Sequence, residues 1–216
     1  MKKMGSLFGV GVVFDKDGTL LDTERFLFEG TVRALAKFDK KHDYDTHRLM
    51  MGAPIEVCLQ LLHQKHPSIT ITKEYLYRKI REVREECGVK PMPGATRLLE
   101  WLSGGGIPIA LATSARREET MQDLETMNWK RHFSAIVTAE DVKFHKPAPD
   151  VYLLAAQRLN LDPCQCYAFE DGVNGATSAM AAGMQVIFVR DDRFGLTPPN
   201  SVKRIINSLE KLVSTS

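Results

Sequence analysis

FDKDGTLLD, residues 14–22, follows directly on the apolar run VGVVF, with which it shares Phe14. A short apolar run rich in β-branched residues predicts a buried strand. Asp15 and Asp17 stand at the end of that strand, which is where open parallel sheets bind their ligands. Two carboxylates this close repel each other unless a cation lies among them. The stretch therefore predicts a charged site at the carboxyl end of the first strand.

Four more apolar runs follow along the chain, separated by segments with helical periodicity. Continuous apolar runs that alternate with amphipathic helices indicate a parallel sheet covered on both faces, an α/β fold. The predicted strands are residues 10–14, 107–113, 134–139, 166–170 and 184–189, and the predicted helices are residues 95–103, 118–128, 150–160 and 174–183.

The chain between the first two predicted strands has a different pattern of apolar residues. Apolar residues recur there at intervals of three and four over residues 23–38, 53–66 and 72–88, with hardly any strand signal. The sequence thus predicts an all-helical domain over residues 22–89, inserted into an α/β core of residues 1–21 and 90–216.

Composition excludes several classes of partner. The 216 residues include 29 basic and 27 acidic ones, and a formal charge of +2 gives no overall field that favours nucleic acid or a membrane surface. No apolar stretch approaches the roughly 20 residues of a membrane span, and the N-terminus lacks a signal-peptide pattern. We expect a cytoplasmic protein with reduced cysteines that is a monomer or a weak homo-oligomer, and whose partner is a small molecule.

Polar residues stand after several of the predicted strands, so the same edge of the sheet should collect them. They are Asp15, Asp17, Thr113, Ser114, Lys146, Glu170 and Asp171. Oxygen ligands with few nitrogen or sulfur candidates favour Mg²⁺, and we expect the four acids of this set to hold it.

The residue types also predict a chemistry. A carboxylate can attack phosphorus once the charge of the phosphoryl oxygens is screened, which a metal ion and Lys146 can do. Asp15 is the expected nucleophile, and Asp17, two residues on, is the expected general acid and base. Thr113 and Ser114 should contact a phosphoryl oxygen, while backbone amides around Lys16 and Gly18 should cradle it.

Four segments in this order resemble the motifs of the haloacid dehalogenase superfamily: DKDGTLLD, LATSA, KPAPD and FEDGVNGATSAMAAGM. The resemblance runs from about Val10 to Val189, and the helical insert resembles the cap of the β-phosphoglucomutase-like and pseudouridine-5′-phosphatase-like branch. It implies a Rossmann-like core with a helical cap. It also implies a Mg²⁺-dependent phosphatase that hydrolyses a small sugar phosphate or nucleotide-type monophosphate through an aspartyl phosphate.

The resemblance assigns roles to single positions. Asp15 matches the phosphorylated aspartate and metal ligand, and Asp17 the acid/base that also binds metal through its backbone carbonyl. Thr113 and Lys146 match the hydroxyl and the lysine of the second and third motifs. Asp171 matches the fourth-motif metal ligand, with Glu170 as an auxiliary one.

Two positions depart from the family pattern. Lys16 is basic where this branch carries an apolar residue, and we expect its side chain to point away from Asp15. The stretch after Gly52 reads APIEV and lacks the arginine with which related mutases hold a second phosphate. This departure disfavours a mutase.

Other interpretations remain open for single residues and for the whole chain. Thr113 could be a strand-end hydroxyl, Lys146 an exposed loop lysine, and Glu170 with Asp171 a helix cap. A calcium-binding EF-hand loop is excluded because Leu20 stands where such a loop needs glycine. The alternative functions are a phosphosugar mutase and, from another class, a phospho-acceptor signalling domain.

Overall fold

The computed structural model describes residues 11–53 and 55–213, which form two compact units. The first, which we call the sheet unit, comprises residues 11–21, Pro91–Asp192 and residues 196–213. The second, the helical unit, comprises Asp22–Lys90 together with Arg193–Gly195.

The sheet unit contains six strands in the order β3-β2-β1-β4-β5-β6, all parallel. All five predicted strands are confirmed, although Val10 lies outside the described residues. The strands are β1 Gly11–Phe14, β2 Ile109–Ala112, β3 Ala135–Val137, β4 Cys166–Glu170, β5 Gln185–Val189 and β6 Arg204–Ile206.

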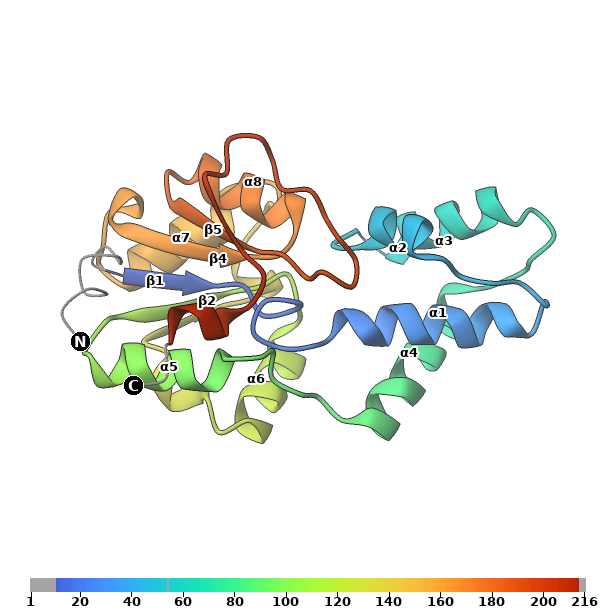
Figure 1. Ribbon diagram of the computed structural model, residues 1–216, viewed down its shortest axis with the longest axis horizontal. Coiled ribbons are helices and arrows are strands. Elements are labelled where there is room, and N and C mark those ends of the chain that lie inside the picture. The colour runs from blue at the N-terminus through green and yellow to red at the C-terminus, as the bar shows by residue number, and fades with distance from the viewer. Residues whose placement is uncertain (1–10, 54, 214–216) are drawn as a thin grey trace. The chain divides into compact units, whose positions relative to one another are not determined.

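Helices cover both faces of this sheet (Figure 1). Helices α5 (Ala95–Gly104) and α6 (Arg117–Thr126) lie on one face, and α7 (Asp150–Arg158) and α8 (Val173–Ala181) lie on the other. Every residue of β1 and β2 is buried as a result, which explains why these strands are apolar throughout rather than at alternate positions. The predicted α/β class and the four core helices are confirmed.

Strand β6 was not predicted from the sequence. It is a three-residue edge strand paired with β5 only, and its Ile205 is 49% exposed. An edge strand with one neighbour needs no continuous apolar run, so it leaves little periodic signal. Four short 3₁₀ turns complete the unit, at Lys130–His132, Ala139–Asp141, Pro163–Gln165 and Leu209–Leu212.

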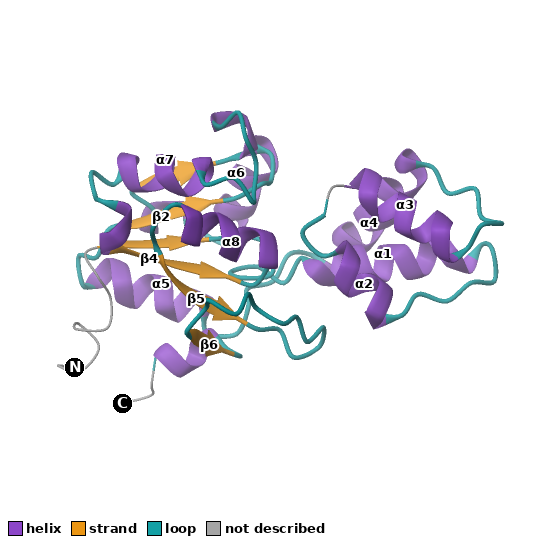
Figure 2. Cartoon of the chain, turned by 90° about the horizontal axis from the view of Figure 1, so that it is seen from above, coloured by secondary structure: helices purple, strands orange, loops and turns teal. Residues whose placement is uncertain are grey.

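The helical unit contains α1 (Glu24–Ala36), α2 (Tyr44–Met50), α3 (Ile55–Lys65) and α4 (Lys73–Cys87), as Figure 2 shows. Capping side chains fix two of the starts: Asp43 accepts a hydrogen bond from the Thr46 amide at 2.8 Å, and Thr72 accepts one from the Tyr75 amide at 3.2 Å. An apolar core holds the helices together, formed by Ala34, Leu35, Met50, Cys58, Leu62, Ile69, Ile71 and Leu76.

Three of these helices match the predicted segments, whereas α2 was missed. Its buried face carries Thr46, His47 and Met50, of which only one is a typical core residue. A seven-residue helix with a polar buried face has no clear apolar periodicity, and only its N-cap, Asp43, marks its start.

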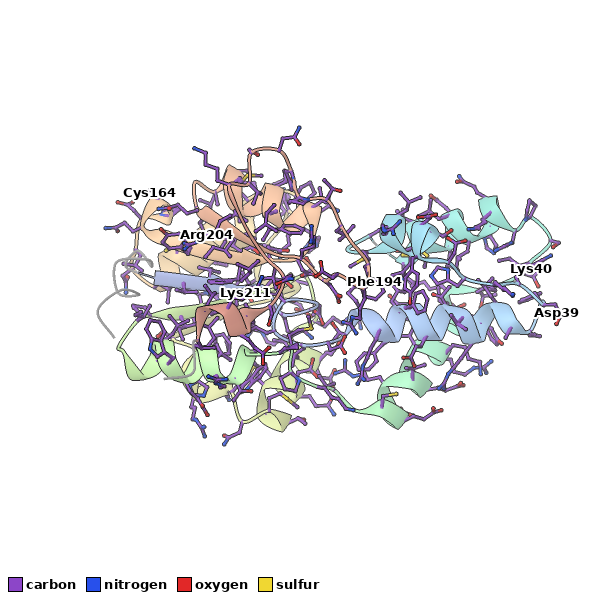
Figure 3. The ribbon with its side chains drawn as sticks, in the orientation of Figure 1. Asp39, Lys40, Cys164, Phe194, Arg204 and Lys211 are labelled. Atoms are coloured by element: carbon purple, nitrogen blue, oxygen red, sulfur yellow. The ribbon has the colours of Figure 1, made fainter. Side chains whose placement is uncertain are left out.

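A third segment of chain belongs to the helical unit, and nothing in the sequence pattern pointed to it. In the loop after β5, the Phe194 carbonyl accepts a hydrogen bond from Arg48 Nε at 2.5 Å. The Phe194 ring, labelled in Figure 3, has its centroid 4.8 Å from that of His47. Arg193 pairs with Asp22 at 2.7 Å.

None of the described helices is long and apolar enough to cross a membrane.

Candidate active site

The candidate site lies where β1 and β4 run side by side, at their carboxyl ends. The strand order reverses there, because β1 is followed along the chain by β2 on one side and β4 by β5 on the other. Asp15 comes directly after β1, and its amide donates to the Phe169 carbonyl of β4 at 3.0 Å. Glu170 is the last residue of β4 and Asp171 the next. The sheet thus delivers three acids to one point, as the sequence predicted.

These acids form a tight, buried cluster. Asp15, Glu170 and Asp171 each offer a carboxylate oxygen within 4.8 Å of the others. All three residues are less than a tenth exposed. Among the described residues, this is the one group of acids, histidines or cysteines with a spacing that suits a metal ion.

Lys146 supplies one positive charge to this cluster. Its Nζ donates to Asp15 Oδ1 at 2.5 Å, to Glu170 Oε1 at 2.6 Å and to the Ala112 carbonyl at 3.1 Å. The side chain is 8% exposed, so the alternative of a solvated loop lysine fails. The Tyr152 hydroxyl also donates to Glu170 Oε1 at 2.8 Å, and its ring centroid lies 5.0 Å from Lys146 Nζ.

The charges of the cluster are not balanced by protein groups alone. Burial raises the pKa of Asp15 to about 7, against the lowering effect of Lys146, and the nearby Glu170 and Asp17 raise it further. Burial alone would lower the pKa of Lys146, but Asp15 and Glu170 outweigh it and raise that pKa. One ammonium shared by several carboxylates leaves a net negative, all-oxygen site, which fits a hard divalent cation such as Mg²⁺.

Two glycines make room for the carboxylates. Gly18 has φ +79°, and a Cβ atom there would lie 2.1 Å from Asp171 Oδ2. A Cβ atom on Gly175 would lie 1.6 Å from Glu170 Oε1. Any side chain at either position would push an acid out of the cluster, so these glycines are required by close approach.

Asp17 and Thr113 lie beside the cluster. Thr113 Oγ1 is 3.5 Å from Asp17 Oδ2, and it accepts a hydrogen bond from the Ala115 amide at 3.0 Å. The Asp17 side chain is 34% exposed, far more than that of Asp15. Asp17 therefore remains accessible to a bound molecule, while Ser114 is exposed on the following loop.

Lys16 and Gly18 have partners within the protein. Lys16 Nζ donates to Asp123 Oδ2 at 2.7 Å, so its side chain reaches helix α6. The Gly18 amide, expected to face a phosphate, donates to the Leu21 carbonyl at 2.8 Å. In this geometry the role of Gly18 is conformational.

Three residues of the site went unnoticed in the sequence. Thr19 Oγ1 donates to Asp171 Oδ1 at 2.8 Å, Tyr152 bonds Glu170, and Asp123 pairs with Lys16. The pattern held a signal for Asp123 alone, because it shares the buried face of α6 with Thr120 and Leu124, where an acid is out of place.

The chain resembles several proteins over nearly its whole length. The family model described as "Haloacid dehalogenase-like hydrolase" matches residues 12–189. A phosphorylated carbohydrates phosphatase from Thermotoga maritima is 33% identical, over 82% of this chain and 83% of its own. A probable pseudouridine-5′-phosphatase from Drosophila melanogaster is also 33% identical, over 91% of this chain and 88% of its own.

A solved structure agrees with these relatives. A putative β-phosphoglucomutase from Thermotoga maritima superimposes with a TM-score of 0.75 at 30% identity, covering 94% of this chain and 96% of its own. The matched residues 12–189 contain the whole site described above. The chain therefore belongs to the haloacid dehalogenase-like hydrolases.

Proposed function

We propose that this protein is a Mg²⁺-dependent phosphatase that hydrolyses a small phosphorylated metabolite through a phosphorylated aspartate. Its relatives are phosphatases, and the chain is a phosphoric monoester hydrolase of the same family. The observation that carries the mechanism is the buried Asp15 carboxylate, which lies among two further acids and shares Lys146 with one of them.

The residues at the carboxyl ends of β1 and β4 supply the oxygen ligands that the metal would need. Asp15, Asp171 and Glu170 would hold Mg²⁺ through their carboxylates, and Asp17 through its backbone carbonyl, as the family resemblance implies. When bound, Mg²⁺ would screen the charge of the phosphoryl oxygens so that an anionic nucleophile can approach. Thr19 and Tyr152 keep the carboxylates oriented by donating to Asp171 and Glu170.

The reaction then proceeds in two steps on the protein's own groups. An oxygen of Asp15 attacks phosphorus, the ester bond to the leaving alkoxide breaks, and Asp17 gives the alkoxide a proton. Asp17, now a carboxylate, takes a proton from a water molecule, which attacks the aspartyl phosphate and releases inorganic phosphate. Lys146 offsets negative charge at Asp15 throughout.

We further propose that the helical unit is a cap that selects the leaving group. The relatives of this chain are named for different substrates, such as phosphorylated carbohydrates for the Thermotoga protein and pseudouridine 5′-phosphate for the Drosophila protein. A shared phosphate-transferring core combined with a helical unit that differs between relatives would account for this diversity. Sugar phosphates and nucleotide-type monophosphates are therefore the substrate classes to examine first.

The test is phosphate release from a panel of these compounds, with Mg²⁺ and with a chelator. We expect at least one compound to be hydrolysed in a reaction that requires Mg²⁺. This reaction should release inorganic phosphate and the free alcohol in equal amounts. The likeness to a putative β-phosphoglucomutase is the reason to test the mutase alternative. An isomerised phosphosugar formed without free phosphate would favour that alternative. Turnover that persists after complete metal removal would overturn the proposed mechanism.

A further inference from the structure

Lys16 is a fully buried cation that the reaction proposed above does not use. It is 0% exposed, although it stands in the turn directly after β1. A lysine is almost never buried to this extent unless an acid pairs with it. The burial of this ammonium therefore calls for an explanation of its own.

Helix α6 provides the partner. Asp123 Oδ2 lies 2.7 Å from Lys16 Nζ, and the Asp123 side chain is as deeply buried as the lysine. Glu119, one turn earlier on α6, lies 3.6 Å from Lys16 Nζ, and its side chain is 46% exposed. Three carboxylates thus surround the Lys16 ammonium, and Asp123 is the nearest and the most deeply buried of them. Asp123 therefore holds the Lys16 ammonium in place.

The same ammonium reaches the expected general acid. Lys16 Nζ is 3.3 Å from Asp17 Oδ1, while the other oxygen of this carboxylate, Oδ2, is 3.5 Å from Thr113 Oγ1. The two oxygens of Asp17 therefore have different polar neighbours. Because Asp17 is itself a third exposed, water alone would leave its side chain free to rotate.

We propose that Lys16, held by Asp123, is a positioning residue that orients the Asp17 carboxyl group, which gives its proton to the leaving group and then acts as a carboxylate base. This inference rests on the proposed function, since it requires Asp17 to act as the acid. An apolar residue at position 16 could fill the same space but could not attract a carboxylate oxygen. A displacement of about 1 Å in a catalytic group is enough to slow a reaction markedly.

The consequence can be measured as a dependence on the leaving group. The value of kcat/KM for phosphate esters reports steps up to the departure of the alcohol. A sugar alkoxide needs a proton at that moment, whereas p-nitrophenolate departs as a stable anion. Misorientation of Asp17 should therefore lower kcat/KM for the best sugar phosphate of the panel much more than for p-nitrophenyl phosphate.

The sharpest variant removes the buried pair as a whole. Lys16→Met with Asp123→Leu replaces two buried charges by apolar groups, a change that is often neutral for stability. We expect a melting temperature close to that of the wild type and a fall of about tenfold in the ratio of kcat/KM for the two substrates. Glu119→Gln, which alters only the exposed neighbour of Lys16, is the matched control and should keep the ratio.

A second variant covers the case in which the double variant does not fold. Asp123→Asn keeps the shape of the anchor but removes its charge, and it should lower the same ratio about threefold. A purely structural pair would lower the melting temperature of this variant and leave the ratio unchanged, which would overturn the inference. A wild-type protein that releases no phosphate from any substrate would instead overturn the proposed function, and the inference with it.

Discussion

The sheet unit and the helical unit bury different kinds of polar groups. In residues 11–53 and 55–213, the buried aspartates, glutamates and lysines all lie in the sheet unit, namely Asp15, Lys16, Asp123, Glu170 and Asp171. The helical unit buries Thr31, Thr46 and His47, and ion pairs such as Arg33–Glu86 and Lys73–Glu56 lie at its surface. Among the described residues, only the sheet unit therefore buries acidic and lysine side chains.

This difference in the burial of charged side chains indicates that the sheet unit carries the chemistry and that the helical unit does not. Removing an ion from water is costly, and an apolar replacement is often at least as stable, so a buried charge cluster is poorly explained by stability alone. Exposed ion pairs carry no such cost. The contrast predicts that changes to the buried charges of the sheet unit affect activity or stability strongly, whereas changes to exposed charges of the helical unit do not.

The largest effect should come from the nucleophile. Asp15→Asn should reduce Mg²⁺-dependent phosphate release by at least about 10⁴-fold, because an amide cannot form the phosphoryl bond. The fold should persist, since the change removes one of several mutually repelling charges. Asp39→Asn in the helical unit is the same substitution at an exposed residue with φ +53°, which asparagine tolerates, and its rate should match the wild type. An active Asp15→Asn enzyme would eliminate the covalent route.

Much of the sheet unit could be predicted from its sequence because each local signal agreed with the fold. Strands buried on both faces are apolar throughout, and the acids that follow β1 and β4 meet because neighbouring parallel strands end at one edge. The partner of Lys16 could not be derived in this way. The pairing of Lys16 with Asp123 joins residues 107 positions apart in sequence, and only the packing of α6 on the sheet determines it.

The helical unit was less predictable, and for a related reason. Helix α2 buries Thr46 and His47, so hydrophobic periodicity does not reveal it. The segment Arg193–Gly195 joins this unit through Phe194, whose neighbours on α1 and α2 come from the opposite end of the chain. Long-range aromatic packing has no local sequence signal.

The second prediction compares two lysines. Lys146→Met should lower the free energy of unfolding at pH 8 by about 3 kcal/mol without metal, because it leaves buried carboxylates without their ammonium. Added Mg²⁺ should restore part of this loss, since it binds the folded state. Lys73→Met in the helical unit breaks an exposed pair and should not change the urea midpoint. Equal losses for both variants would contradict the contrast between the units.

The third prediction concerns the general acid. Asp17→Asn should slow kcat by at least about 10²-fold, the lower end of the range for general acid–base catalysis. Its melting temperature should change little, because the Asp17 side chain is partly exposed. Rapid-quench measurement of the phosphorylated enzyme would show which of the two steps is slowed. A variant with an unchanged rate would assign the proton transfers to another group.

The smallest expected effect concerns His47, a buried neutral side chain of the helical unit. Burial lowers the pKa of His47 to about 4, and the adjacent His42, 3.3 Å away, lowers it further. The unfolded chain binds a proton near pH 6.5, so between pH 6.5 and 4 it holds more protons than the folded state, and stability falls as the pH falls. From pH 7 to pH 5 the contribution of His47 to this loss should be about 2 kcal/mol, measured by urea unfolding as the difference between the wild type and His47→Gln. His47→Gln should reduce that pH dependence, while His63→Gln, at an exposed histidine of α3, should keep it. If His47→Gln retained the full loss, the buried histidine would not be the group that makes the helical unit sensitive to acid.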